Sequence, residues 1–202
     1  MEKERENMEK ELKITRESKS ILNMHPQKFA MWLFLLTVLM IFAAYTSAYI
    51  VRKGQGNWIP FELPVTFLYS TGIIVLSSVF MQLSYFAAAK NNVNGVRLYT
   101  LLTFIAGVVF LMMQWTGYGK LIDMNLYFSD PNNVSGSFIY VITGVHAVHL
   151  ISALIVLLIV LITTFKVENI KDKLVRMEIC TTYWHFLGGL WVYLYLFLQL
   201  NQ

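Results

Sequence analysis

Two histidines lie three residues apart inside one long apolar segment, in the run Thr143-Gly144-Val145-His146-Ala147-Val148-His149. On a helix, residues at this spacing lie on neighbouring surfaces, so both imidazoles could bind one metal ion. One helix supplies only two such ligands, and a haem or catalytic metal needs further donors from other helices. Imidazoles in helical bundles also form hydrogen bonds between helices. We therefore expect His146 and His149 to make hydrogen bonds between helices or to contact polar headgroups rather than to hold a metal.

A second polar group lies in the last apolar segment. Glu178 precedes His185 by seven residues, which places both on one face of a helix, and Gln199 follows fourteen residues later. A carboxylate and an imidazole in one row can pass protons. However, one Glu and one His do not cross the ~30 Å of a bilayer's hydrocarbon core. We therefore favour a structural role, in which this face meets another helix or a lipid headgroup and Gly188 and Gly189 permit close approach.

These residues belong to a chain whose composition is typical of a membrane protein. Of its 202 residues, 56% are hydrophobic and 14% are charged, against ~25% charged in soluble domains. Five apolar segments are each near the ~20 residues that a helix needs to cross a bilayer, and a strand barrel would need shorter, alternating segments. We predict an all-α integral membrane bundle, residues 29–202, with five transmembrane helices at about 29–50, 65–89, 98–117, 138–165 and 179–200.

The distribution of basic residues predicts the orientation of this bundle. Residues 1–28 form a charged tail, and thirteen Lys and Arg fall on its side of the membrane against three on the other. The positive-inside rule then places the amino terminus in the cytoplasm and the carboxyl terminus in the periplasm. Trp58, Trp115 and Trp184 lie near segment ends, where an indole ring suits the headgroup level. Because the basic residues flank membrane segments instead of forming one patch, no nucleic acid partner is expected.

Together the two motifs resemble subunit III of the heme-copper terminal oxidases, in a short form with five helices. Residues 178–191, EICTTYWHFLGGLW, are similar to the family pattern in which a Glu stands seven residues before the His of Tyr-Trp-His-Phe and a Trp follows. Residues 143–149 resemble the family's Thr-Gly-x-His-x-x-His. Further support comes from the run MWLF at residues 31–34, from the pair Ser77 and Ser78, and from Gln114 with Tyr118.

The chain departs from the family pattern at three acidic positions. Thr37 stands where the first helix of the family often has a buried Glu, Gly117 where the third often has a Glu, and Gly188 where an Asp often follows Tyr-Trp-His-Phe. The carbodiimide-reactive role of such acids therefore cannot be transferred to this chain. The two additional amino-terminal helices of longer members, which form part of a lipid-holding cleft there, are also missing.

The resemblance implies an accessory subunit without catalytic, cofactor-binding or metal residues of its own. Such a subunit packs on the catalytic oxidase subunit I and other oxidase subunits, binds phospholipid, and sustains proton uptake and stability during turnover. The complex, a cytochrome c or quinol oxidase of a bacterial plasma (inner) membrane, would reduce dioxygen to water with proton pumping, with haem and copper in partner subunits. The candidates for lipid or subunit contact are His146, His149, Glu178, Trp184, His185, Gly188 and Gly189.

Two alternative functions stay open at the level of the sequence. One is a related accessory membrane protein of a nitric oxide reductase system, whose helices resemble the same family. The other is an independent membrane redox protein with His146, His149 and His185 as haem ligands. The absorption spectrum of the isolated chain separates the last class, because only a haem protein has a Soret band.

Overall fold

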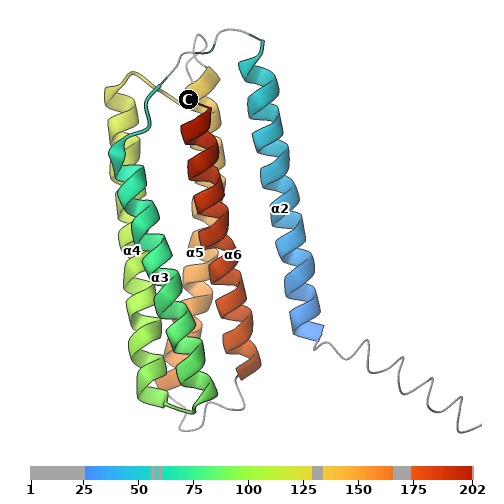
Figure 1. Cartoon of the computed structure of the whole chain (residues 1–202), viewed down its shortest axis with the longest axis vertical. Helices are drawn as coiled ribbons and strands as arrows, with labels where there is room; N and C mark the ends of the chain where they lie inside the picture. Colours follow the sequence, from blue (N-terminus) through green and yellow to red (C-terminus); the bar gives the residue numbers. More distant parts are fainter. Residues whose placement is uncertain (1–25, 56–57, 59–60, 129–133, 166–173, 202) are drawn as a thin grey trace, which may run out of the picture.

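A computed structural model describes residues 26–55, 58, 61–128, 134–165 and 174–201. The described part is built from long helices (Figure 1), and it confirms the predicted all-α membrane bundle. The helices are α2 (Pro26–Lys53), α3 (Val65–Ala89), α4 (Val93–Asp123), α5 (Val134–Phe165) and α6 (Leu174–Leu200). Most of the predicted tail, residues 1–25, lies outside the described residues, and residues 26–28 already belong to α2.

Each of the five apolar segments lies within one helix, but most helices extend beyond the apolar part. The largest extension is in α4, whose 31 residues correspond to about 46 Å at 1.5 Å per residue. That length covers the headgroup layers as well as the ~30 Å hydrocarbon core. The sequence marks the start of α4, because the Asn92 side chain accepts a hydrogen bond from the Gly95 N–H, as helix-capping residues do.

By length and composition, α2, α3, α4 and α5 are apolar enough to cross a membrane, whereas α6 does not meet the same criterion. Arg176 and Glu178 lie in its first turns, and tyrosines, threonines and a histidine follow. Nevertheless, α6 runs alongside the other helices in Figure 1 and packs against α2, α3 and α5. Several of its polar and aromatic side chains, namely Thr181, Tyr183, Trp184 and Trp191, are buried within the bundle. A hydropathy scale therefore underestimates how well α6 suits a bundle in a membrane.

Helix α2 stands at one side of the bundle, beside α6 and apart from α4 in Figure 1. It is tied to α6 near both ends. At its first turn Lys28 contacts Glu178, and near its last turn Tyr49 and Lys53 donate hydrogen bonds to the Asn201 carbonyl oxygen. The outer face of α2 is apolar and exposed, as expected for contact with lipid.

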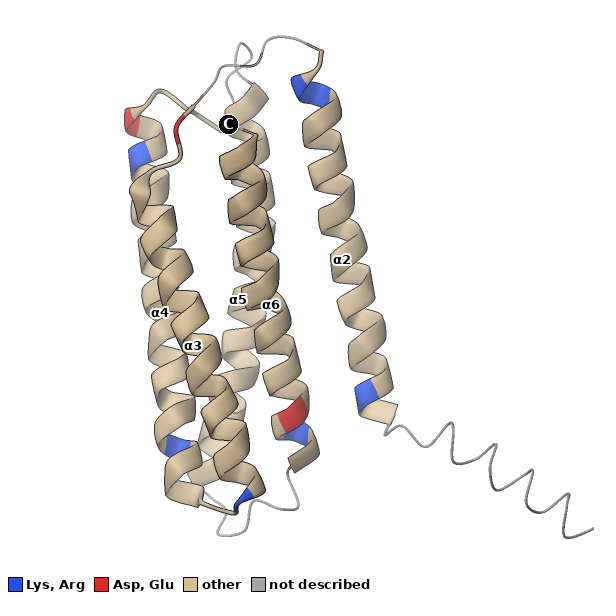
Figure 2. Ribbon diagram, viewed as in Figure 1, with Lys and Arg blue, Asp and Glu red and all other residues tan. Residues whose placement is uncertain are grey.

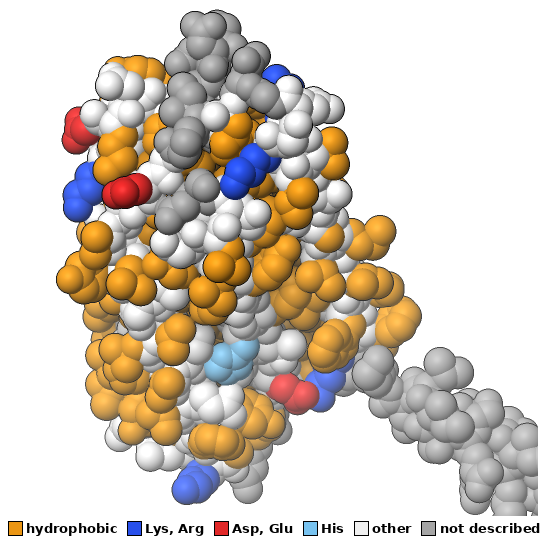
Figure 3. Space-filling model, turned by 45° about the horizontal axis from the view of Figure 1, so that its top comes forward, with side chains coloured by type: hydrophobic (Ala, Val, Ile, Leu, Met, Phe, Trp, Pro, Cys, Tyr) orange, Lys and Arg blue, Asp and Glu red, His pale blue; other side chains and the backbone are white. Residues whose placement is uncertain are grey.

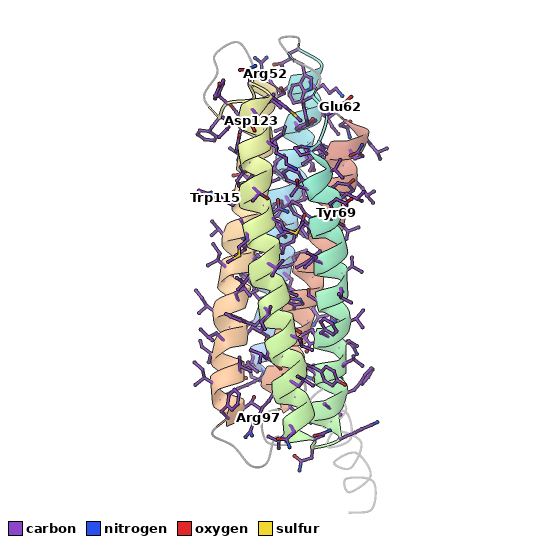
Figure 4. The ribbon with its side chains drawn as sticks, turned by 90° about the vertical axis from the view of Figure 1, so that its left-hand side faces the viewer. Arg52, Glu62, Tyr69, Arg97, Trp115 and Asp123 are labelled. Atoms are coloured by element: carbon purple, nitrogen blue, oxygen red, sulfur yellow. The ribbon has the colours of Figure 1, made fainter. Side chains whose placement is uncertain are left out.

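The charged side chains of the described residues lie at the two ends of the bundle (Figure 2). One end, here called the basic end, carries Glu178 and the basic residues Lys28, Lys90, Arg97 and Arg176. The opposite end carries Arg52, Lys53, Glu62, Lys120 and Asp123. Between them, large side chains such as Tyr69 and Trp115 point outward (Figure 4), with 65% and 79% of their surface exposed. This separation is typical of a bundle whose middle lies in hydrocarbon.

Candidate functional site

His146 lies at the centre of the bundle, inside a cage of aromatic rings. Its ring centroid is 5.2 Å from that of Trp191, 6.2 Å from that of Phe42 and 6.3 Å from that of Phe110. The side chain has no exposed surface, and neither ring nitrogen has a hydrogen-bond partner among the described residues. The three rings come from α2, α4 and α6, and they pack around a side chain of α5. His146 therefore lies where four helices meet and is held by ring packing. The expected hydrogen bond between helices or headgroup contact is wrong for His146, because its fully buried nitrogens have no partner among the described residues.

His149 lies one turn further along α5 and is half-buried toward α2. Its Nδ1 is 2.8 Å from the Val145 carbonyl oxygen of its own helix. Its ring packs against Phe34 and Phe42, at centroid distances of 6.5 and 5.8 Å. The two histidines thus have different surroundings and share only the Phe42 ring.

Glu178 forms an ion pair with Lys28 between the first turns of α6 and α2. Each carboxylate oxygen lies 2.7 Å from the Lys28 Nζ. The Glu178 side chain is 39% exposed and the Lys28 side chain 31%. A pocket of ≈ 80 Å³ beside this pair is lined by both residues and by Met31, Trp32 and Thr182, among others. The ion pair therefore lies at the surface of the basic end, next to an exposed indole ring.

His185 does not contact Glu178 directly, although both side chains face the same pocket. Its Nε2 is 3.0 Å from the Oε1 of Gln82 on α3. The shared pocket has a volume of ≈ 200 Å³ and is lined by Gln82, Tyr85, Glu178, Thr181, Thr182 and His185. The carboxylate and the imidazole therefore belong to one polar surface but join α6 to two different helices.

Trp184 is the anchor of α6 in the core. It is 1% exposed, and its indole N–H donates a hydrogen bond of 3.0 Å to the Ser77 hydroxyl on α3. Gly107 on α4 makes room for its ring, since a Cβ there would come within 2.6 Å of the Trp184 Cη2. The expectation of a headgroup position is wrong for Trp184, because a hydroxyl inside the bundle satisfies its N–H. Like His146, Trp184 contacts this chain's own helices in this structure, out of reach of lipid.

The two adjacent glycines of α6 point in different directions. A Cβ at Gly188 would lie 3.0 Å from the Ser78 Oγ, so α3 approaches α6 closely there. Gly189 is exposed, and no atom lies within 4 Å of the position of its Cβ. The structure thus shows close helix approach at Gly188 and an open face at Gly189.

Two of the three departures from the acidic pattern, Gly117 and Gly188, fall where neighbouring helices leave little room for a side chain. Thr37 is exposed on α2 and donates its hydroxyl hydrogen bond to the Phe34 carbonyl oxygen. A Cβ at Gly117 would come within 2.9 Å of the Phe67 ring, where α4 packs on α3. Gly117 and Gly188 therefore serve as contact points between helices in this chain.

Two partners of the candidate residues were missed by the sequence analysis, namely Lys28 and Gln82. Lys28 was placed at the end of the charged tail, and Gln82 was not singled out. The sequence did contain a clue to them, because a carboxylate such as Glu178 and an imidazole such as His185 need polar partners at the edge of a membrane segment. Among the described residues, no group of three His, Cys, Asp or Glu side chains is placed to hold a metal ion.

Comparison with known proteins places this arrangement in a family. Residues 17–201 match the family described as Cytochrome c oxidase subunit III. The chain is 30% identical over 178 residues to the cytochrome bo(3) ubiquinol oxidase subunit 3 of Buchnera aphidicola subsp. Schizaphis graminum, covering 86% of this chain and 93% of that protein. It is 28% identical over 181 residues to the cytochrome c oxidase subunit 3 of Corynebacterium diphtheriae, covering 84% and 85%, respectively. The chain belongs to the cytochrome c oxidase subunit III family.

Proposed function

We propose that this chain is the accessory subunit III of a respiratory oxidase that uses cytochrome c or quinol. Its relatives are named as third subunits of both kinds of oxidase, which supports membership in a complex with other subunits. In the proposal this chain packs on the catalytic subunit, which carries haem and copper and reduces dioxygen to water with proton pumping. This chain stabilises the complex and sustains proton uptake during turnover.

The observation that carries this proposal is that residues of the family motifs contact other helices of this chain. Three motif residues join helices of this chain: His146 through aromatic rings, His185 through Gln82, and Glu178 through Lys28. Three histidines that served one haem would converge on a common centre. Here His146 and His149 share the Phe42 ring as a common neighbour, and His185 bonds to Gln82 on α3. This arrangement favours the structural subunit over the independent redox protein.

Phospholipid binding belongs to the same proposal, and its headgroup site is the pocket beside Lys28 and Trp32. The Lys28 ammonium can contact a lipid phosphate, and the exposed Trp32 ring suits the depth of the headgroups. The basic end of the bundle would then face the cytoplasm of a bacterial cell, as the excess of Lys and Arg on that side indicates. Its location is the bacterial plasma membrane, and the organisms of the curated relatives support this placement.

The proposal is tested by purifying the complex through an affinity tag on this chain. We expect a haem-containing catalytic subunit to be recovered in equal amount, with oxygen consumption when electrons are supplied. A strain without this chain should keep its haem spectrum but lose activity faster during sustained turnover. Recovery of the chain alone, or of a Soret band in the isolated chain, would overturn the proposal.

A further inference from the structure

One face of α6 is only partly covered by the other described helices, which reach it at Glu178 and His185. This face, here called the α6 strip, consists of residues that are all half-buried or exposed, namely Glu178, Thr182, His185, Gly189, Val192, Leu196 and Gln199. On one flank α6 bonds to α3 through Trp184 and Trp191, and on the other it contacts α2 through Tyr183 and Tyr193. In Figure 3 a histidine and an acidic–basic pair lie in a pale band between hydrophobic side chains.

The spacing within the α6 strip is that of a helix–helix contact. Successive residues are four and three positions apart in strict alternation, a period of 3.5, by which one helix keeps its seam against a partner. The strip is also rich in small and polar residues, which are enriched where membrane helices meet. By contrast, the exposed face of α5 carries the large apolar residues Val148, Ile151, Ile155, Ile159 and Ile162. The α6 strip therefore differs from a face that meets acyl chains.

Polar groups lie deep within the strip. His185 is seven residues, or about 10 Å, further along α6 than Glu178. Its bond to Gln82 uses one ring nitrogen and the amide oxygen, while the pair lines the open pocket of ≈ 200 Å³. A lipid acyl chain offers no hydrogen-bond partner at this depth, whereas a side chain of a neighbouring helix does.

The shape and length of the strip fit a single membrane-crossing helix. The exposed Gly189 lies near its middle, and the space around its Cβ position is open, so the backbone of a second helix can approach closely. From Glu178 to Gln199 the strip measures about 32 Å, which is one crossing of the hydrocarbon core.

The charge at the end of the strip complements such a helix. Glu178 is the single acidic side chain that the described residues place at the basic end, and it is 39% exposed. Membrane helices carry Lys and Arg at their cytoplasmic ends. A helix along the strip would bring such a residue to the Glu178 carboxylate, beside Lys28.

From these observations we infer that the α6 strip binds one transmembrane helix of another subunit of the complex. That helix carries small or β-branched residues at a period of 3.5, a hydrogen-bonding side chain opposite His185, and a Lys or Arg opposite Glu178. The inference rests on the proposed function, because it requires a complex in which this chain is one subunit.

Photocrosslinking in the complete complex, in its native membrane, tests the inference. A benzophenone side chain is placed at Leu196 on the strip and, as the control, at Ile155 on the exposed face of α5. We expect Leu196 to give an adduct that maps to one transmembrane segment of another subunit, and Ile155 not to give that adduct. Adducts of Leu196 with lipid alone, or with a second copy of this chain alone, would overturn the inference. Co-purification of a haem subunit with this chain would leave the proposed function standing in that case.

A matched pair of glycine variants adds a second test. Gly189→Leu fills the strip, and Gly72→Leu adds the same side chain to α3, where the Cβ position is also open. We expect Gly189→Leu to lower the yield of the Leu196 adduct by about tenfold and Gly72→Leu to change it by less than about twofold. Circular dichroism verifies that both variants keep their helices. An equal loss in both, with helices intact, would contradict the inference.

Discussion

At the scale of single residues, the histidines of this chain show that one residue type can meet different needs in one bundle. His185 bonds to Gln82, His149 lies against the Val145 carbonyl oxygen, and His146 is packed among rings. A buried polar atom without a partner costs about 1–3 kcal/mol. The aromatic cage around His146 offsets that cost through the contact area of the Phe42, Phe110 and Trp191 rings.

The first prediction concerns the aromatic cage of His146. Replacing His146 with Phe keeps the ring volume and removes two nitrogens that have no partner among the described residues. We expect the melting temperature of the purified complex to stay unchanged or to rise, whereas His146→Ala leaves a cavity and costs about 2–5 kcal/mol. Elemental analysis should give the same iron, copper and zinc content in both variants. Loss of one metal equivalent in His146→Phe would mean that the imidazole is a ligand.

The second prediction compares the two polar contacts of α6. The half-buried His185–Gln82 bond should contribute about 1–3 kcal/mol when one partner is removed, and the more exposed Lys28–Glu178 pair less than about 1 kcal/mol. We expect His185→Ala to release this subunit in detergent more easily than Glu178→Ala does. The haem spectrum and the initial oxygen consumption should survive in both.

Gln82→Ala is the control for this comparison. Gln82 and His185 share one hydrogen bond, so either single variant already removes it. The double variant, His185→Ala with Gln82→Ala, should therefore release the subunit about as easily as the less stable of the two single variants does. If the losses of subunit retention in the two single variants add up in the double variant, the two side chains act separately. Abolition of initial oxygen consumption in either α6 variant, with the subunit still assembled, would place Glu178 or His185 on a proton path.

At the scale of the helices, glycines of α4 mark the places where α3 and α6 pack closely against it. Gly107 of α4 faces the Trp184 ring, and Gly117 of the same helix faces Phe67 of α3. Small residues at such points allow helices in membranes to approach closely, since there is no hydrophobic driving force between helices in lipid. The aromatic side chains of α3 and α6 fill the space that these glycines leave.

The third prediction tests the contact between α4 and α6. A Cβ at Gly107 would lie 2.6 Å from the Trp184 Cη2 and 2.8 Å from the Leu154 Cδ2, so Gly107→Ala should destabilise the subunit by about 1–3 kcal/mol. Gly119→Ala on the same helix is the control. No atom lies within 4 Å of that Cβ position, and alanine favours a helix over glycine by about 1 kcal/mol. We expect the midpoint of thermal unfolding to fall in Gly107→Ala alone. A fall of equal size in both variants would contradict the packing argument.

At the scale of the whole molecule, the fold follows from the sequence much more closely than the site does. Apolar length places every helix, because hydrocarbon leaves a backbone few other ways to satisfy its hydrogen bonds. The pairings of side chains depend instead on which helices become neighbours. Lys28 and Glu178 are 150 residues apart, and Gln82 and His185 are 103 apart. Segment ends alone also misplaced Trp184, since only the packed bundle brings Ser77 to its N–H.

The fourth prediction is the orientation of the bundle in the membrane. Gln55 and Lys90 are exposed near opposite ends of the bundle, and the native Cys180 is buried, so single cysteines at the two exposed positions report on the two sides separately. The order of the segments in the sequence predicts that thirteen of the sixteen Lys and Arg fall on the side of Lys90, and moving such charges across a membrane is costly. In intact cells an impermeant maleimide should therefore label Gln55→Cys, whereas Lys90→Cys should react only after the cells are opened. The chain without an added cysteine measures the background from Cys180. Labelling of Lys90→Cys in intact cells, with Gln55→Cys protected, would mean that the basic end faces outward, and the excess of positive charge would then need a partner outside the cell.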